Sequence, residues 1–166
     1  MRGVDEQARQ VFETFARARI DALLRYGHLL TGNPHAAEDL VQSALAKSLA
    51  AWRRIEREDP EAYVRRCMVN EAISHSRRRA WRERAVERLP ETPVEDEAND
   101  DRGVVMRALA ELPPRQRAVL VLRYYEDRSE EEIASMLGIA RGTVKSQASK
   151  GLAHLRSSLG QLEATR

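Results

Sequence analysis

Apolar residues recur at helical spacing through most of this chain, in segments separated by proline, glycine and polar turns. Residues 4–30 fit one long helix or two helices joined at a bend, and the turn Thr31-Gly-Asn-Pro34 ends this segment. A second helix is predicted from about 35 to 55, with a broad apolar face that includes Trp52. These two segments together predict a helical hairpin.

A third helix is predicted from Pro60 through a run of arginines toward Arg88. Asp59 can cap its first turn, and proline fits the first helical position. The residues after Pro90 are rich in acids and hold little that could be buried, which is typical of a linker. We therefore expect a first domain over 1–88, an acidic linker over 89–103, a second domain over 104–160 and a tail over 161–166.

The second domain ends in a predicted helix–turn–helix. A short helix begins near Val104 and stops at Pro113-Pro114, and another covers 115–125. Ser129 can then cap a helix as a capping box with Glu132, and Gly138 can end it in the left-handed conformation.

Thr143 is the predicted cap of the last helix, which separates inward apolar positions from an outward polar face. The inward positions are Val144, Ala148, Leu152 and Leu155, and the outward ones are Lys145, Ser146, Gln147, Ser149 and Lys150. No carboxylate occurs from Ile133 through Leu162, although Asp and Glu nearly match Lys and Arg over the whole chain. A solvated helical hairpin would share the spacing, but the missing acids favour a face that binds phosphates and base edges.

Composition supports an all-α fold and excludes several classes of protein. Aromatic residues make up 5% of the chain, and 8 glycines and 6 prolines are few for 166 residues. No apolar run approaches the length of a membrane span and no signal peptide is evident, so we expect a cytoplasmic protein with no membrane partner. The single cysteine, Cys67, lies on an apolar stripe, and the four histidines lack metal-ligand spacing. We expect no metal, no cofactor, no small-molecule substrate and no catalytic residues.

Several motifs occur together in a characteristic order. They are Ala37-Glu-Asp-Leu-Val-Gln42, then Trp52, then a helix with Asn70 that continues into arginines, then Leu112-Pro-Pro-Arg-Gln-Arg117, then Gly142-Thr-Val-Lys-Ser146. In this order the chain resembles bacterial RNA polymerase sigma factors of the extracytoplasmic-function (ECF) type, and most resembles the actinobacterial SigE-like group. The resemblance runs from about Phe12 to Leu159 and covers both domains.

The resemblance implies a region 2 helical bundle and a region 4 helix–turn–helix, joined by the flexible acidic linker. It also implies binding to core RNA polymerase through its beta-prime and beta subunits, binding to promoter DNA, and an anti-sigma factor as a further partner. The predicted beta-prime contacts are Asp39, Leu40, Gln42, Ser43 and Leu49. On spacing alone, the same helix could be an ordinary amphipathic helix with a solvated edge.

The first domain would recognise and melt the minus-ten element, and the second would recognise the minus-thirty-five element. The predicted minus-ten residues are Asn70, Arg77, Arg78, Arg79, Trp81 and Arg82, beside a pocket formed by the loop at about 55–62. The predicted minus-thirty-five residues are Arg141, Thr143, Lys145, Ser146, Gln147, Ser149 and Lys150. Without the resemblance, Asn70 could be a helix amide bonded to the hairpin, and the arginines a solvated face with Trp81 over the core.

Three positions depart from the family pattern. Ala148 stands where a larger aliphatic residue is usual, Gln147 where arginine is frequent, and Ser74 where an acid often follows the asparagine. The first indicates looser packing and the second an altered promoter preference, and the third lies near the predicted minus-ten pocket. A stand-alone transcriptional regulator with the same helix–turn–helix is the competing interpretation, and it would need a dimer interface or a ligand pocket.

Overall fold

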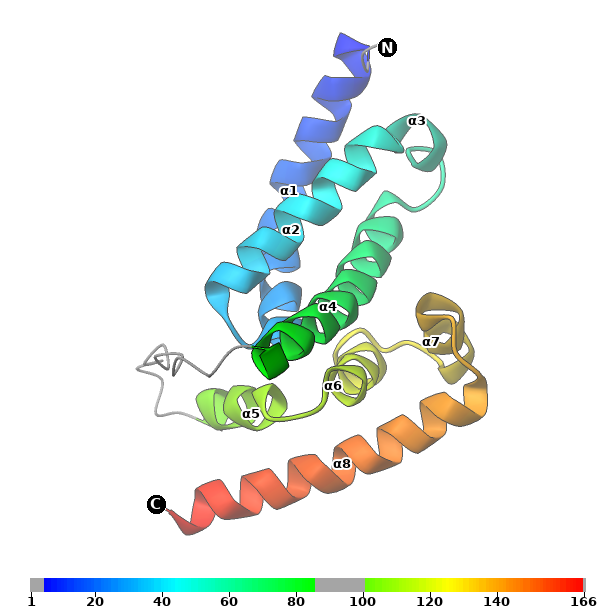
Figure 1. The fold of residues 1–166 in the computed structure, drawn as a ribbon. Helices are drawn as coiled ribbons and strands as arrows, with labels where there is room; N and C mark the ends of the chain where they lie inside the picture. Colours follow the sequence, from blue (N-terminus) through cyan, green and yellow to red (C-terminus); the bar gives the residue numbers. More distant parts are fainter. Residues whose placement is uncertain (1–4, 86–100, 166) are drawn as a thin grey trace.

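The computed structural model describes residues 5–85 and 101–165, and side chains over 5–76 and 101–165. Every regular element in these residues is a helix, which confirms the all-α prediction (Figure 1). The first half of the chain contains α1 (Glu6–Thr31), α2 (Pro34–Ala50), α3 (Trp52–Ile55) and α4 (Pro60–Ala85). The second half contains α5 (Asp101–Ala110), α6 (Pro114–Leu120), the π-helical turn η1 (Val121–Tyr125), α7 (Glu130–Leu137) and α8 (Arg141–Ala164).

The predicted hairpin is formed by α1 and α2, and α1 is a single continuous helix. Gly32, with a φ of 69°, ends α1 in the left-handed conformation. Asn33 then caps α2, because its Oδ1 accepts hydrogen bonds from the backbone N–H groups of His35 (2.9 Å) and Ala36 (3.1 Å). The turn Thr31-Gly-Asn-Pro34 thus reverses the chain between two long helices.

The predicted helix over 35–55 is interrupted at Ala51 and resumes as α3. The interruption places Trp52 in an aromatic cluster with α1. Its ring lies 5.2 Å from that of Phe12 in an edge-to-face arrangement and 5.4 Å from that of Phe15. Because Trp52 is only 2% exposed, this cluster fixes the far end of the hairpin.

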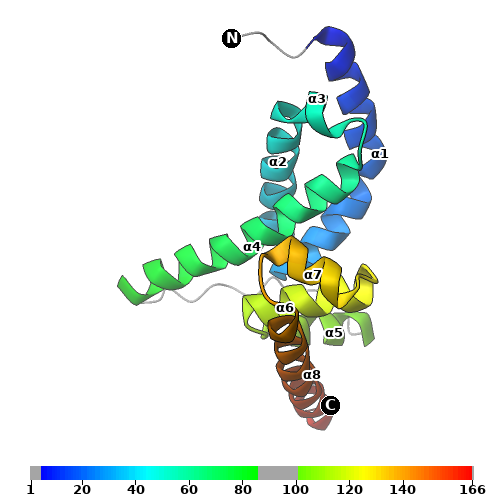
Figure 2. The same ribbon diagram turned by 90° about the vertical axis from the view of Figure 1, so that its right-hand side faces the viewer.

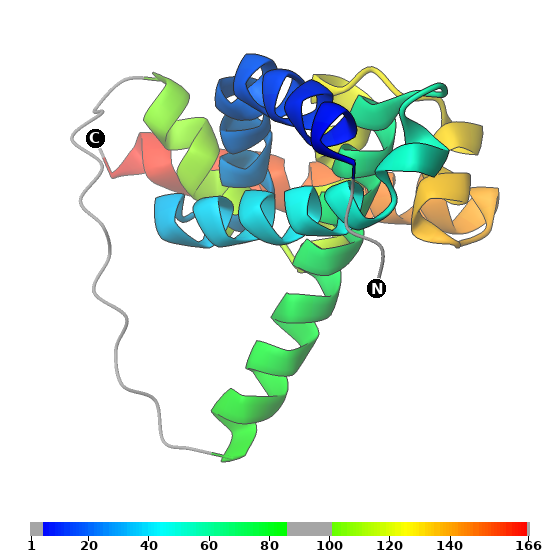
Figure 3. The ribbon, with the colours of Figure 1, turned by 90° about the horizontal axis from the view of Figure 1, so that it is seen from above.

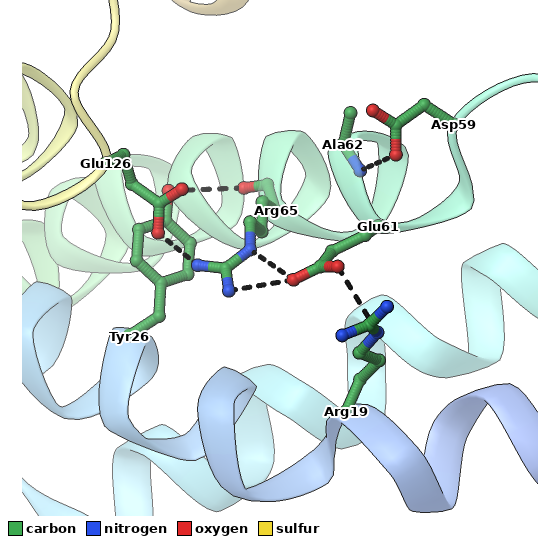
Figure 4. Close-up of polar contacts among 7 residues, drawn as sticks. All are labelled: Arg19, Tyr26, Asp59, Glu61, Ala62, Arg65 and Glu126. Atoms are coloured by element: carbon green, nitrogen blue, oxygen red, sulfur yellow. Dashed lines mark hydrogen bonds and ion pairs between the residues drawn. The ribbon is translucent and has the colours of Figure 1, made fainter.

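Helix α4 begins as predicted, since Asp59 Oδ1 accepts a hydrogen bond from the Ala62 backbone N–H at 3.0 Å (Figure 4). Its last turns project away from the rest of the protein (Figure 3). The described part of the helix ends at Ala85, so the predicted continuation to Arg88 lies outside the described residues.

The acidic linker prediction falls mainly on residues 86–100, which lie outside the described residues. Its last three residues are helical, because α5 already begins at Asp101. The helix predicted over 115–125 continues from α6 into η1, where the Glu126 backbone N–H donates to the Val121 carbonyl five residues earlier, at 3.0 Å. This wider turn ends the helix before the helix–turn–helix begins.

The helix–turn–helix is present as α7 and α8. Ser129 Oγ accepts from the Glu132 backbone N–H at 3.1 Å, and Gly138 has a φ of 65°. The expected cap at Thr143 was wrong: α8 begins at Arg141, after an extended Ala140. The Thr143 backbone N–H already donates to the Ala140 carbonyl at 3.0 Å, so Thr143 lies inside the first turn.

The two halves pack against each other (Figures 1 and 2). One apolar core joins residues of α1, α2 and α4 to buried residues of the second half, which are Ala118, Val119, Val121, Leu122, Ile133 and Val144. Arg117, on α6, also joins the halves, because its Nη1 donates to the Leu30 carbonyl at the end of α1 at 3.1 Å. The two helical domains therefore share one interior in this arrangement.

Candidate nucleic-acid interface

The outward face of α8 carries the residues predicted for the minus-thirty-five element. Arg141, Lys145, Ser146, Ser149 and Lys150 are exposed, whereas Thr143 and Gln147 are half-buried. The inward face packs as predicted, since Val144 is fully buried and Ala148, Leu152 and Leu155 contact the apolar clusters. The first three turns of α8 therefore present cations, hydroxyls and one amide on a firmly packed helix.

Gly151 explains why small residues occur on the inward face of α8. A Cβ atom at this position would lie 3.1 Å from Leu120 Cδ1 and 3.4 Å from Gln116 Cβ, so α8 approaches α6 closely there. Ala148, one turn earlier, lies half-buried against the core. The looser packing that the sequence suggested at Ala148 stays a prediction, since the close approach lies at Gly151.

One carboxylate does approach this face, from the helix before it. Glu130 Oε2, in the first turn of α7, lies 3.3 Å from Arg141 Nε and 3.9 Å from Lys145 Nζ. Glu130 lies just outside the acid-free segment, and the turn between the helices brings it back to the start of α8. Sequence reasoning missed this pairing because it depends on the folding of the turn.

Asn70 opens onto a hollow of about 1020 Å³ between the halves. One wall comes from the loop predicted to form the minus-ten pocket, with Ile55, Glu58, Asp59 and Ala62 lining it. Ser74, where the family often has an acid, is exposed and lines the same hollow. The structure therefore brings Asn70 and the predicted loop together at one concave surface.

The opposite wall of this hollow is α7, which the sequence did not predict. The Asn70 Nδ2 group donates to the Arg66 carbonyl at 3.0 Å on its own helix and to the Met136 carbonyl at 2.9 Å on α7. Arg66 Nη2 lies 3.4 Å from the Ser135 carbonyl. The Asn70 amide is therefore bonded to α7, and not to the hairpin as the alternative interpretation held.

The side chains of Arg77, Arg78, Arg79, Trp81 and Arg82 lie outside the described residues, although their backbone belongs to α4. Figure 2 shows this end of α4 extending past the body of the protein. The helix thus carries these positions beyond the packed core, and their role in DNA binding stays a prediction.

The five predicted polymerase contacts on α2 are not equally exposed. Asp39 and Gln42 face solvent, while Leu40 is only 6% exposed and belongs to the core. Ser43 Oγ donates to Glu71 Oε1 at 2.6 Å, and Leu49 packs half-buried beside Trp52. In this structure the helix therefore offers mainly its polar edge to a partner, and Leu40 supports that edge from beneath.

A buried polar centre around Arg65 joins the halves (Figure 4). The Arg65 guanidinium pairs with Glu61 (Nη2 to Oε1, 2.9 Å) and with Glu126 of the second half, and it lies 5.0 Å above the Tyr26 ring. The Arg65 and Glu126 side chains are each 11% exposed. Sequence reasoning could not find this centre, because 61 residues separate the two partners.

Burial shifts the pKa values of groups at this centre. Loss of solvent raises the pKa of Glu126, and the nearby Arg65 and Arg128 only partly oppose that rise. The pKa of the Tyr26 hydroxyl is also raised, first by burial and then by the Glu126 charge. Burial between the halves therefore makes the charged form of each group less favourable than it is in water.

Within residues 5–76 and 101–165, no group of three or more His, Cys, Asp and Glu side chains is placed to hold a metal ion. In the same ranges, each helix is too short or too polar to cross a lipid bilayer.

A second hollow of about 520 Å³ is mainly apolar and is lined by Leu29, Leu109, Tyr124, Tyr125 and Leu155 among others. Tyr124 is 63% exposed at this hollow. The sequence pattern placed Tyr124 in a helix but did not predict its exposure.

Comparisons with known proteins match both halves in order. Residues 10–82 match the family model for sigma-70 region 2, and residues 102–155 match that for sigma-70, region 4. The RNA polymerase sigma-E factor of Streptomyces coelicolor is 44% identical over 151 residues, which cover 89% of this chain and 85% of the relative. The ECF RNA polymerase sigma factor SigL of Mycobacterium tuberculosis is 36% identical over 155 residues, which cover 87% of this chain and 86% of the relative.

Among solved structures, the chain is similar to the sigma factor RpoE of Bartonella quintana, crystallised in complex with the anti-sigma factor NepR. The TM-score is 0.69 at 26% sequence identity, over 91% of this chain and 98% of the other. The similarity thus extends over both helical halves and their arrangement.

Proposed function

This chain belongs to the sigma-70 family of RNA polymerase sigma factors and to its ECF type, and from this premise we propose how its two halves divide the work of promoter recognition. The protein binds core RNA polymerase and directs initiation at specific promoters. The observation that carries this function is the match of both halves, in order, to regions 2 and 4. The match of the first half to region 2 also displaces the stand-alone regulator as an interpretation.

The second half recognises the minus-thirty-five element through α8. Its exposed cations suit phosphates, and Gln147 can bond an adenine edge bidentately. The absence of carboxylates from Ile133 to Leu162 supports this role, since an acid on this face would repel the DNA backbone. The residues assigned to this contact are Arg141, Thr143, Lys145, Ser146, Gln147, Ser149 and Lys150.

The first half recognises and melts the minus-ten element. Asn70 lies at the hollow with the 55–62 loop, and its amide can donate to and accept from an unstacked base. The arginines at 77–79 and 82, with Trp81, would bind the unwound strand, since aromatic and basic side chains suit single-stranded DNA. Asp39, Gln42 and their neighbours on α2 dock on the beta-prime subunit.

Polymerase carries out the chemistry of transcription, so we assign this chain no catalytic residue and no cofactor. We place the protein in the cytoplasm, where bacterial promoters are transcribed. The likeness to a sigma factor bound to an anti-sigma factor supports a regulatory partner of that class for this chain. We propose a first domain over 1–88, and we move the start of the second domain from 104 to 101, where α5 begins, with its end at 160.

Run-off transcription from genomic promoter fragments, with purified core RNA polymerase and with or without the protein, tests this function. We expect new promoter-specific transcripts that depend on the protein. Lys145→Ala should weaken initiation, whereas Arg107→Ala should not, because Arg107 is exposed on α5 and lies outside the proposed face. Failure of the unmodified protein to bind core or to add a transcript would reject the assignment.

A further inference from the structure

Glu130 and Arg141 meet where the two helices of the helix–turn–helix come together (Figures 1 and 2). The Glu130 carboxylate, in the first turn of α7, lies 3.3 Å from Arg141 Nε, and Arg141 is the first residue of α8. In a helix–turn–helix, the N-terminal residues of the second helix contact base edges in the major groove. Glu130 therefore contacts a residue at the DNA-reading end of α8 without belonging to α8.

The contact does not involve the terminal nitrogens of the Arg141 guanidinium. Arginine binds guanine bidentately, because two of its N–H groups match the O6 and N7 acceptors of the base. Nη1 and Nη2 form such a fork, and a hydrogen bond from Nε to Glu130 Oε2 does not use either of them. The same hydrogen bond restricts rotation of the arginine side chain. Glu130 thus orients the fork and leaves it available.

The exposure of the two side chains agrees with a carboxylate that lies behind the cation. The Arg141 side chain is 61% exposed, whereas that of Glu130 is 26% exposed. Glu130 Oε2 also lies 3.9 Å from Lys145 Nζ. The two cations outnumber this one acid, so the start of α8 still attracts DNA phosphates.

The position of Glu130 relative to α8 is fixed by the turn and by the core. Gly138 ends α7 with a φ of 65°, and Ile133 and Val144, one on each helix, are fully buried in the same core. The carboxylate itself lies in the first turn of α7, where free backbone N–H groups favour negative charge. Glu130 therefore has the rigid support that one side chain needs in order to orient another.

A purely structural role for Glu130 is the alternative. Arg141 and Lys145 are four residues apart, so they lie on one face of α8 and repel each other. A carboxylate beside both would relieve that repulsion whether or not either residue reads a base. The two roles differ in what they require: relief of repulsion depends on the charge of Glu130, whereas orientation of Arg141 depends on its acceptor oxygen.

We propose that Glu130 is a positioning residue for promoter recognition, which holds the Arg141 guanidinium so that its terminal fork reads a guanine in the minus-thirty-five element. Orientation before binding reduces the entropy lost when the arginine is ordered on DNA. It also directs the arginine to a base edge instead of a phosphate, which every DNA sequence offers. The proposal rests on the function proposed for the outward face of α8.

Single-atom changes in the DNA test this proposal, with holoenzyme made from core RNA polymerase and the full-length chain. Each guanine of a minus-thirty-five element found by run-off transcription is replaced in turn by 7-deazaguanine, which lacks the N7 acceptor but still pairs with cytosine. Fluorescence anisotropy gives, for each guanine, the ratio of the affinities for the natural and the substituted duplex. This ratio cancels the overall charge of a variant, because both duplexes carry the same phosphates.

We expect one guanine at which the substitution weakens binding of the unmodified protein about tenfold and has no such effect on Arg141→Ala. At that guanine, Glu130→Ala should lower the ratio below about threefold, because the fork is no longer oriented. Glu131→Ala, the matched control at the exposed neighbouring position, should keep the full ratio. Glu130→Gln should keep most of it, since the amide oxygen still accepts from Nε.

The proposal is overturned by an unchanged ratio in Glu130→Ala, by an equal loss in Glu130→Gln and Glu130→Ala, or by the lack of any guanine whose ratio depends on Arg141. Arg141→Lys is a second test that leaves α7 untouched. It keeps the charge but has no fork, so the ratio should fall as in Arg141→Ala while the salt dependence of binding is unchanged. A ratio retained in Arg141→Lys would also overturn the proposal.

Run-off transcription separates this proposal from the function on which it rests. If the unmodified protein gives promoter-specific transcripts, each of these negative results rejects only the positioning of Arg141 by Glu130. If it gives none, the function proposed for α8 fails first.

Discussion

Arg117 provides the sharpest test of how the two halves are held together. Its guanidinium donates to four backbone carbonyls, those of Leu109 (2.8 Å), Leu30 (3.1 Å), Ala110 (2.6 Å) and Leu112 (3.0 Å). Burial lowers the pKa of Arg117, so the charge is held there at some cost in solvation. Arg117→Met keeps apolar volume but removes every donor.

The structure sets the size of the effect. The Leu109 carbonyl keeps a second donor, the Leu112 backbone N–H at 3.1 Å, whereas Leu30 and Leu112 lose a buried partner. At about 1–3 kcal/mol for each unsatisfied carbonyl, the loss is about 2–6 kcal/mol. Because relief of the buried charge offsets part of it, we expect about 3 kcal/mol, in the lower half of that range. This corresponds to a fall in Tm of about 6–12 °C for a chain of this size.

Urea and thermal unfolding, followed by circular dichroism, measure this loss. Arg115→Met is the matched control, because Arg115 lies two residues earlier on α6 and is only half-buried; we expect it to change stability by less than about 0.5 kcal/mol. Arg117→Lys should recover only part of the loss, since one ammonium group cannot serve three segments. If Arg117→Met lowers the free energy of unfolding no more than Arg115→Met does, the four carbonyls do not depend on Arg117.

Three further predictions concern single side chains. Asn33→Ala removes the two cap hydrogen bonds of α2 and should cost about 1 kcal/mol in unfolding free energy by urea titration, whereas an unchanged midpoint would show that the cap is dispensable. Glu130→Gln removes the carboxylate that pairs with Arg141 and Lys145, so the polymerase complex should bind minus-thirty-five duplex severalfold more tightly at low salt. Glu131→Gln, at an exposed position, is the control. Equal affinities of the two variants would exclude competition between Glu130 and DNA. Glu126 has a raised pKa in the folded protein, so its contribution to stability is present below the ordinary carboxyl pKa and is lost as pH rises through the folded value. Glu126→Gln should therefore gain stability relative to the unmodified protein as pH rises through that window, and parallel pH profiles would contradict the shift.

Local signals in the sequence predicted most helix boundaries and which side of α8 faces outward. Asp59, Ser129 and Gly138 act within a few residues of themselves, so their roles can be read from the chain. The break at Ala51 was missed because it serves the packing of Trp52 against α1, which periodicity does not contain. The prediction of Thr143 as a cap was wrong because α8 begins at Arg141, directly after the extended Ala140. Thr143, the better capping residue by type, therefore lies inside the helix.

The relation between the halves could not be predicted from the sequence. Glu126 and Arg65 each look like solvated charges in their own helices, and only the packing of η1 against α4 pairs them. The same is true of Asn70, whose second acceptor is a backbone carbonyl with no sequence signature. Conversely, the DNA-binding assignment of one run rests on the family resemblance and on its many bases and few acids, and it stays a prediction. The run contains Arg77, Arg78, Arg79, Trp81 and Arg82.

Three of the charged groups between the halves also have a partner on their own side. Arg65 has Glu61, Glu126 has the charge of Arg128, and Arg117 has three carbonyls of the second half. Separation of the halves would therefore leave these three charges with a partner, and its main cost would be exposure of the shared apolar core.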